Sequence, residues 1–297
     1  MQTKRIWQVD AFAGTVYRGN PCAVIFDAGD IPAERMQAIA QEMNLSETVF
    51  LCPPTVPDAD YRARIFTPVN ELPFAGHPTL SAAWSVHRSL AEAGFGPLPT
   101  VLRQECGAGI VPVEVTEQDG RTLFTMTQNA PKFIPLDIDH ARVASILGCA
   151  VADIEGPALD AVNTGIPWMF TRLKTPAQVA ALKPDMTGIM GLSAETGIVG
   201  MGVWSVGALA VGCDVKLRCF APAGAAPEDP VTGSANGCLA ALIARDAVLG
   251  AAPFRYRAEQ GTEMGRDGRV EVEVLAGEIR PRVGGEVVRV MTGELVV

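Results

Sequence analysis

The sequence predicts an α+β protein built from two similar domains, in which each domain has many strands and one central helix rich in glycine and alanine. Its 297 residues suit two domains better than one. Short apolar runs, bounded by turn residues, occur throughout both halves and are typical of strands. The second half also repeats four elements of the first half in the same order, which is the strongest indication of two matched domains.

This repeat has a period of about 150 residues, which is too long for a solenoid and indicates two domains related by a pseudo-twofold axis. A chance echo is the alternative, and the shared order of the elements argues against it. Since the periodicity breaks at Gln128, we expect domains at 1–128 and 129–285. A last strand near 286–297 can pack back onto the N-terminal domain. The matched segments are Asp160–Phe170 with Asp10–Ile25, Pro176 with Pro32, Lys216–Pro222 with Arg62–Pro68, and Gly233–Ala235 with Gly76–Pro78.

Individual elements follow from local signals. Pro32 is typical of the first turn of a helix, and the apolar residues after it recur at helical spacing. Residues 61–66 alternate apolar side chains with arginines, which predicts a half-buried strand. Gly76 is expected to open a central helix that runs to about Ser89, and Gly233 its counterpart. The remaining expected elements are strands at 6–9, 22–26, 47–51 and near 100–105, 110–116 and 122–127, and helices at 137–147 and from Pro176.

Composition excludes several classes of function. A net charge of −9 disfavours binding to nucleic acid or to an anionic membrane, although a local site can still hold a small anionic metabolite. The seven cysteines show no metal-binding spacing, and no apolar signal segment opens the chain. We therefore expect a cytoplasmic protein with reduced thiols that act as small buried hydrophobic groups.

One uncharged run, residues 196–213, has the minimum length of a membrane-spanning helix. It contains five glycines, and no basic residues flank it. Because glycine is costly inside a helix, we expect buried strand material with a turn here and no membrane span.

The loops that precede the two matched helices are the most informative features. A helix N-terminus leaves backbone N–H groups unpaired and attracts anions, and glycine lets a ligand approach them closely. Gly76 and Gly233 are therefore candidates to hold a substrate carboxylate across a domain cleft. Plain helix capping by Thr79 or Ser234 is the alternative.

Three ionisable residues near these loops are candidates for chemistry. At the start of its helix, His77 is expected to be neutral because the helix dipole disfavours the cation, and a neutral imidazole can bind substrate. Glu47 lies where a helix gives way to a buried strand, and desolvation there favours a carboxyl group that shuttles protons. Asp229 lies in a proline-bounded loop and can fix a substrate amine. A structural histidine, a solvated glutamate and a plain loop carboxylate are the respective alternatives, and His87 and His140 are expected at the surface.

Motifs for other chemistries are absent from the sequence. There is no GxGxxG or GxxxxGK phosphate loop, no GxSxG and no HExxH. The three histidines are scattered and suggest no metal centre. We therefore expect neither a cofactor nor a metal.

Six segments in this order resemble the motifs of the PhzF-like (phenazine-biosynthesis isomerase-like) family, within the diaminopimelate-epimerase-like fold. They are Asp10–Phe12, Gly19–Val24, Met43–Thr48, Phe66–Pro68, Glu71–Thr79 and Pro227–Ala235. The resemblance implies two barrel-like sheets, each wrapped around a central helix, with the active site between the domains. It also implies cofactor-free isomerisation of the kind seen with trans-2,3-dihydro-3-hydroxyanthranilate, and commonly a homodimer.

The same resemblance assigns roles to individual residues. Glu47 takes the place of the family's proton-shuttling glutamate, and His77, Asp229 and Ser234 match its substrate-binding residues. Epimerases and racemases of this fold carry a cysteine in both helix-start loops, where this chain has Gly76-His77 and Gly233-Ser234. Cys238 is one turn too far into its helix to substitute. A single-carboxylate isomerase is therefore the leading hypothesis, and a non-catalytic binding protein and an epimerase or racemase are the alternatives.

Overall fold

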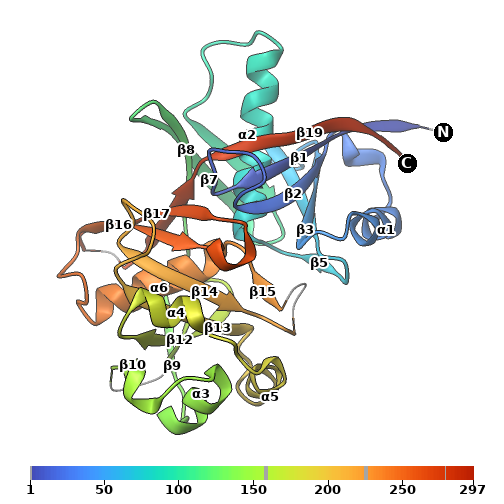
Figure 1. Ribbon diagram of the computed structural model, residues 1–297. Coiled ribbons are helices and arrows are strands. Elements are labelled where there is room, and N and C mark those ends of the chain that lie inside the picture. The colour runs from blue at the N-terminus through green and yellow to red at the C-terminus, as the bar shows by residue number, and fades with distance from the viewer. Residues whose placement is uncertain (1, 157–159, 224–226, 278) are drawn as a thin grey trace. The chain divides into compact units, whose positions relative to one another are not determined.

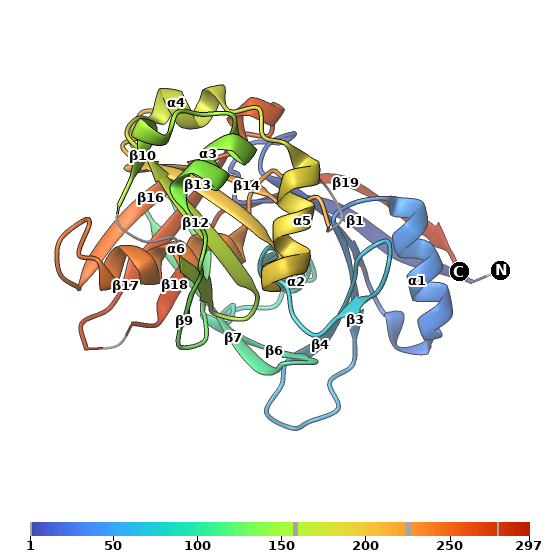
Figure 2. The ribbon, with the colours of Figure 1, turned by 90° about the horizontal axis from the view of Figure 1, so that it is seen from below.

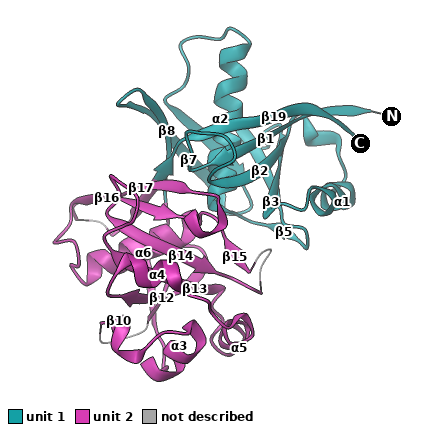
Figure 3. Cartoon of the chain, viewed as in Figure 1, with its two compact units in different colours: residues 1–127, 284–297 teal, residues 128–283 magenta. Residues whose placement is uncertain are grey.

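The computed structural model describes residues 2–156, 160–223, 227–277 and 279–297, and their contacts divide the chain into two compact units (Figure 3). Unit 1 comprises Met1–Thr127 together with Gly284–Val297, and unit 2 comprises Gln128–Val283. The C-terminal strand β19 therefore belongs to unit 1, where it pairs antiparallel with the N-terminal strand β1 (Figure 1).

Unit 1 is a curved sheet around one helix. Its strands are β1 (Thr3–Ala11), β2 (Asn20–Ile25), β3 (Glu47–Cys52), β4 (Tyr61–Phe66), β5 (Glu71–Leu72), β6 (Val101–Cys106), β7 (Gly109–Gln118), β8 (Arg121–Thr127) and β19 (Val287–Val296). The central helix α2 (Gly76–Glu92) packs against β1, β2, β3, β4, β6, β7, β8 and β19. Small side chains such as Ala82 and Ala83 are fully buried on α2, which lets the strands approach it from every side.

A second apolar layer covers the other face of the same sheet. Helix α1 (Ala33–Met43) packs against β3 and β4 through its apolar stripe (Figure 2). Met36 and Ile39 from this helix join Ile25 and Phe50 from the strands in one buried cluster. The helix ends at Asn44, whose left-handed conformation (φ 49°) turns the chain toward β3.

Unit 2 has the same order of strand pairings. In unit 1, the pairs β2–β3 and β4–β6 are parallel, and the pairs β3–β4 and β6–β7 are antiparallel. In unit 2, the corresponding parallel pairs are β12–β13 and β14–β16, and the corresponding antiparallel pairs are β13–β14 and β16–β17. Its strands are β9 (Lys132–Pro135), β10 (Ile154–Glu155), β11 (Asp160–Asn163), β12 (Pro167–Leu173), β13 (Gly200–Val206), β14 (Val215–Phe220), β15 (Glu228–Asp229), β16 (Phe254–Gln260) and β17 (Gly268–Val274), and β18 (Pro281–Gly285) crosses the division between the units. Its helices are α3 (His140–Leu147), α4 (Pro176–Ala181), α5 (Met186–Thr196) and the central α6 (Gly233–Arg245). The predicted α+β class with a duplicated helix-and-sheet pattern is confirmed.

Several local expectations need correction. The uncharged run does contain a buried strand, β13, but its first residue, Thr196, ends a helix, α5, that was not expected. No helix among the described residues is long and apolar enough to cross a membrane. His87 and His140 lie only partly at the surface, since both are half-buried and the ring of His87 lies edge-on to Phe124 with centroids 5.6 Å apart.

The cysteines are free in every case, but not all are buried as expected. Cys22, Cys52, Cys219 and Cys238 lie in the interior, whereas Cys106, Cys149 and Cys213 are half-buried. Short 3-10 helices also occur at Ala28–Asp30 (η1), Val151–Asp153 (η2) and Thr262–Met264 (η3).

Candidate functional site

Glu47 is the first residue of β3. Its strand runs parallel to β2, where Cys22 is its register partner. Every later residue of β3 is buried, while the Glu47 side chain keeps 17% of its surface exposed. The carboxyl group therefore lies at the edge of the apolar core, where a proton acceptor is reachable by substrate but poorly hydrated.

His77 is the second residue of α2, and its Nε2 lies 3.4 Å from Oε2 of Glu47. Burial lowers the pKa of His77 from 6.5 to about 3, and a hydrogen bond to the backbone of Pro21 opposes this shift only in part. The predicted neutral imidazole is confirmed, although desolvation and not the helix dipole is its main cause.

The tautomer of His77 follows from its contacts. Proline has no N–H, so the ring must donate its proton to the carbonyl oxygen of Pro21. Among the described residues Nε2 has no hydrogen-bond partner, so the donor is Nδ1. Nε2 therefore carries a lone pair directed at the carboxyl group of Glu47, and a proton placed on either group can be shared with the other.

Neither central helix has a side-chain cap at its first turn. Thr79 donates its hydroxyl to the carbonyl oxygen of Ala75 (2.8 Å) and accepts from Nε2 of Gln104 (2.9 Å). Ser234 is engaged elsewhere by Trp168. The capping alternative is therefore wrong for both residues, and the first-turn N–H groups at Gly76 and Gly233 have no side-chain oxygen from their own helix.

In unit 2, Asp229 is held by a buried network. The Thr232 hydroxyl donates to Oδ2 of Asp229 at 2.6 Å. Gln260, which is fully buried, donates from Nε2 to the Asp229 carbonyl oxygen (3.1 Å) and to Oγ1 of Thr232 (3.0 Å). Its Oε1 accepts from the Thr232 N–H and from the Asn236 amide. Because a carboxylate can only accept, the Thr232 proton is directed at Asp229, while a lone pair of the same hydroxyl accepts from Gln260, and these contacts orient the carboxylate.

Ser234 is the second residue of α6, and its oxygen accepts a hydrogen bond from Nε1 of Trp168 at 3.2 Å. An indole N–H can only donate, so the Ser234 hydroxyl retains its proton for another acceptor. The preceding residue, Gly233, is fixed through its carbonyl oxygen by Nε2 of Gln128 (2.9 Å). A Cβ at Gly237 would lie 1.9 Å from Oε1 of Gln128, so the close approach of Gln128 to the helix requires glycine there.

The buried thiols nearest these groups are protonated. Burial, reinforced by the negative charge of Glu47, raises the pKa of Cys22 far above its usual range. Burial also raises the pKa of Cys238 to about 11, and this thiol lies 3.2 Å from the Thr164 hydroxyl. Because the thiolate is the reactive form, neither cysteine is suited to abstract a proton.

The predicted residues thus form two groups, one in each unit. Glu47, His77 and Gly76 come together in unit 1, and Asp229, Gly233 and Ser234 come together in unit 2. Sequence reasoning missed Trp168, Thr232, Gln260 and Gln128, which orient these groups. Gln260 and Gln104 hold the first turns of α6 and α2. They do not occupy matched positions of the repeat, because the strand registers align Gln104 with Ala258. No cluster of three or more potential metal ligands occurs within the described part of the chain.

Comparisons with known proteins identify the family of the chain. Residues 9–293 match the family model described as phenazine biosynthesis-like protein. The chain is 36% identical over 272 residues to a trans-2,3-dihydro-3-hydroxyanthranilate isomerase of Pseudomonas aeruginosa, covering 88% of this chain and 87% of that protein. It is 31% identical to the uncharacterized isomerase YddE of Escherichia coli K12, covering 93% and 92% of the two chains.

Among solved structures, a PhzF-family protein of Bacillus anthracis superposes with a TM-score of 0.89 at 27% identity and full coverage of both chains. A hydroxyproline epimerase of Agrobacterium vitis, at 14% identity and a TM-score of 0.62, covers 99% of this chain and 92% of that chain and shares the fold alone. The non-catalytic alternative is therefore set aside: the chain is an isomerase that belongs to the phenazine biosynthesis-like (PhzF) family.

Proposed function

We propose that this protein is a cofactor-independent isomerase that moves a proton between two carbons of a small, carboxylate-bearing metabolite. The observation that carries the proposal is the pair formed by Glu47 and neutral His77, whose facing atoms lie 3.4 Å apart. A half-buried carboxylate beside a neutral imidazole can take a proton from carbon and return it at low cost, because the imidazole lone pair shares the proton in the intermediate state.

In this mechanism Glu47 is the acid–base. Its carboxylate removes a proton from one substrate carbon, the double bonds shift, and the same carboxyl group returns the proton to another carbon on that face. His77 stabilises the protonated carboxyl by accepting its hydrogen bond through Nε2. The proton leaves and re-enters the substrate, so no external oxidant, reductant or co-substrate is needed.

The groups of unit 2 are proposed to bind the substituents of a carboxylate-bearing substrate. The Ser234 hydroxyl, whose oxygen already accepts from Trp168, donates to the substrate carboxylate together with the helix N–H group at Gly233. Asp229, fixed by Thr232, accepts from a substrate amine or hydroxyl group. The substrate class follows the Pseudomonas relative, whose name specifies a hydroxylated dihydroanthranilate, a ring with a carboxylate and an amine.

An epimerase function, the remaining alternative, is less well supported. The two helix starts carry His77 and Ser234, and the nearby Cys22 and Cys238 are buried thiols with raised pKa values. A two-base reaction needs an activated group on each side of one carbon, and of the described groups named above the Glu47 pair alone has that character.

The test is substitution of Glu47 by Gln. This change keeps the size and hydrogen-bonding capacity of the side chain but removes proton transfer. We expect kcat to fall by at least about 1,000-fold with little change in substrate affinity, measured with trans-2,3-dihydro-3-hydroxyanthranilate and related ring carboxylates. Glu34→Gln on the exposed part of α1 is the matched control and should leave both values unchanged. A Glu47→Gln enzyme with near-normal turnover would refute the role of Glu47.

A further inference from the structure

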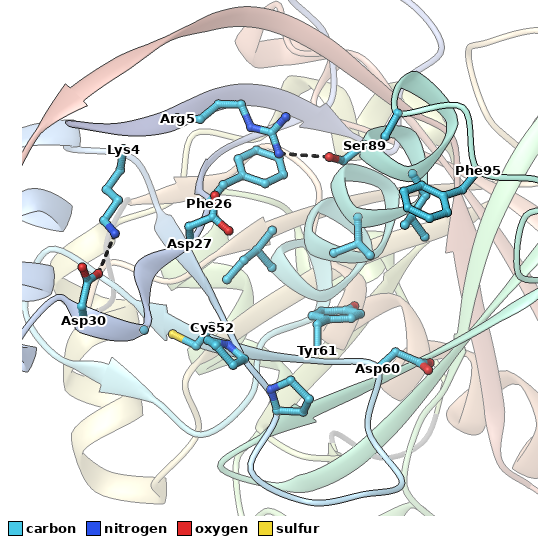
Figure 4. Close-up of a pocket in the computed structure, with 17 residues that line it drawn as sticks. Lys4, Arg5, Phe26, Asp27, Asp30, Cys52, Asp60, Tyr61, Ser89 and Phe95 are labelled. Carbon is cyan, nitrogen blue, oxygen red and sulfur yellow. Dashed lines mark hydrogen bonds and ion pairs between the residues drawn. The ribbon is translucent and has the colours of Figure 1, made fainter. Parts of the chain in front are cut away.

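Unit 1 contains a cavity of about 600 Å³ at the end of α2 that lies away from His77 (Figure 4). Neither Glu47 nor His77 lines it. Along the helix, Ser89 in its wall lies about 18 Å from His77, since an α-helix rises 1.5 Å per residue. The cavity is therefore separate from the catalytic pair.

The walls of the cavity are largely apolar and already ordered. They are formed by Phe26, Leu51, Val86, Leu90 and Phe95, and Phe95 is 65% exposed at the rim. Tyr61, also in the lining, is buried and donates its hydroxyl to Oε1 of Gln104 at 3.2 Å. A concave, mostly apolar space of this volume with a few polar groups is typical of small-molecule sites.

Arg5 supplies a positive charge that the protein does not neutralise. Its guanidinium lies 3.8 Å from the centroid of the Phe26 ring and donates one hydrogen bond, to the Ser89 hydroxyl at 3.0 Å (Figure 4). Within the described ranges it has no carboxylate partner, whereas the neighbouring Lys4 is paired with Asp30 at 2.6 Å. A guanidinium held over a ring, with most of its donors unused, is preorganised for a carboxylate.

Asp27 supplies a negative charge beside Arg5. The Phe26 N–H donates to the Arg5 carbonyl oxygen (2.9 Å). Asp27 is the next residue in the chain after Phe26. The side chain of Asp27 is exposed and lines the cavity, and it forms no ion pair with any described residue. Arg5 and Asp27, which form no ion pair among the described residues, thus both line a largely apolar cavity.

We propose that this cavity binds a small zwitterion with an apolar side group, an α-amino acid. Its carboxylate pairs with Arg5, its ammonium group pairs with Asp27, and its side chain lies against Leu90 and Phe95. A bound ligand that has a carboxylate but no amine leaves the negative charge of Asp27 without a partner. A ligand that has an amine but no carboxylate leaves the positive charge of Arg5 without a partner. The site thus distinguishes the zwitterion from both single-charge analogues.

Calorimetric titration of the full chain with three probes that share one ring tests this assignment. L-Phenylalanine should bind, while 3-phenylpropionate and phenethylamine should each bind at least about 10-fold more weakly, the usual cost of losing one charge-assisted contact. Equal affinity for phenylalanine and either analogue, or no binding of phenylalanine, overturns the proposal.

Variants then locate the binding. Arg5→Gln and Asp27→Asn should each weaken phenylalanine binding by about 10-fold or more. Arg35→Gln, on the exposed face of α1, is the matched control and should bind normally. Ser234→Ala should also bind normally, and a loss of phenylalanine binding in Ser234→Ala would place the ligand in the catalytic site and overturn the proposal.

Hydrogen exchange on the unmodified chain gives an answer that does not depend on the folding of any variant. Phenylalanine should slow exchange at residues 4–5, 26–30 and 86–95. Slowing confined to the first turns of α2 or α6 contradicts the assignment. Because none of these measurements uses catalysis, failure of the cavity proposal and failure of the proposed isomerase function are separable.

Discussion

Trp168 donates its indole N–H to the Ser234 oxygen at 3.2 Å, although 66 residues separate them in the sequence. The contact joins β12 to the first turn of α6 and removes one of the orientations open to the serine hydroxyl. A buried indole thereby determines where the proton of a proposed substrate-binding group is directed.

Trp168→Phe should therefore affect substrate binding more than turnover. Phenylalanine fills most of the space but cannot donate, so the Ser234 hydroxyl is free to rotate. We expect KM to rise by up to about 10-fold with a smaller change in kcat, consistent with the loss of one neutral hydrogen bond. Trp204→Phe, at a second buried tryptophan on β13, is the control and should retain the wild-type KM. Equal KM values for all three proteins would show that the indole contact is only structural.

Acid should destabilise the protein through His77. The folded-state pKa of this residue is about 3, below its usual 6.5, so between these values the unfolded chain binds a proton that the folded chain does not. Its stabilising contribution is complete above about pH 6.5 and is lost as the pH falls toward 3, with a slope of about 1.4 kcal/mol per pH unit within that window.

Denaturant titrations from pH 7 to 4 measure this slope. His77→Gln should give a flatter dependence of the unfolding free energy on pH than the wild type. His87→Gln serves as the comparison, because burial lowers the pKa of His87 too, but this ring is only half-buried. Identical slopes for wild type and His77→Gln would contradict a buried, neutral His77.

Gly237→Ala should destabilise unit 2. The new Cβ would lie 1.9 Å from Oε1 of Gln128, so Gln128 must move and its bonds to Gly233 and Thr164 must weaken. Overpacking of this kind costs about 1–3 kcal/mol. Gly191→Ala on α5 is the matched control: nothing lies within 4 Å of its new Cβ, and better helix propensity should raise stability by up to about 1 kcal/mol. Thermal unfolding of both variants checks the opposite signs.

Local signals accounted well for the elements that carry the proposed site. Alternating residues predicted a strand at 61–66, and β4 has those bounds. Both glycine-led helices, α2 and α6, begin at the predicted residues. Helix α5 was missed because Gly188 and Gly191 lower its helix propensity. Asp185 is a residue type that favours the N-cap position, and in the structure its carboxylate accepts from the Thr187 N–H.

The orienting residues of the site could not be predicted from spacing. Gln260 reaches Thr232 across 28 positions and Trp168 reaches Ser234 across 66, so only the fold brings them together. The neutral form of His77 was predicted from its position at a helix start. The main cause of its lowered pKa is burial, which the sequence did not reveal.

The most direct test of the proton-shuttle role of Glu47 is isomerisation in deuterated water, followed by NMR of substrate and product. If the abstracted proton exchanges with solvent, the wild type and Glu34→Gln should place solvent deuterium at one defined carbon of the product. If the proton is returned before it exchanges, a deuterium label on the substrate should instead appear at the new carbon. Glu47→Gln should show neither label movement nor product. Label movement at a normal rate in Glu47→Gln would contradict the account.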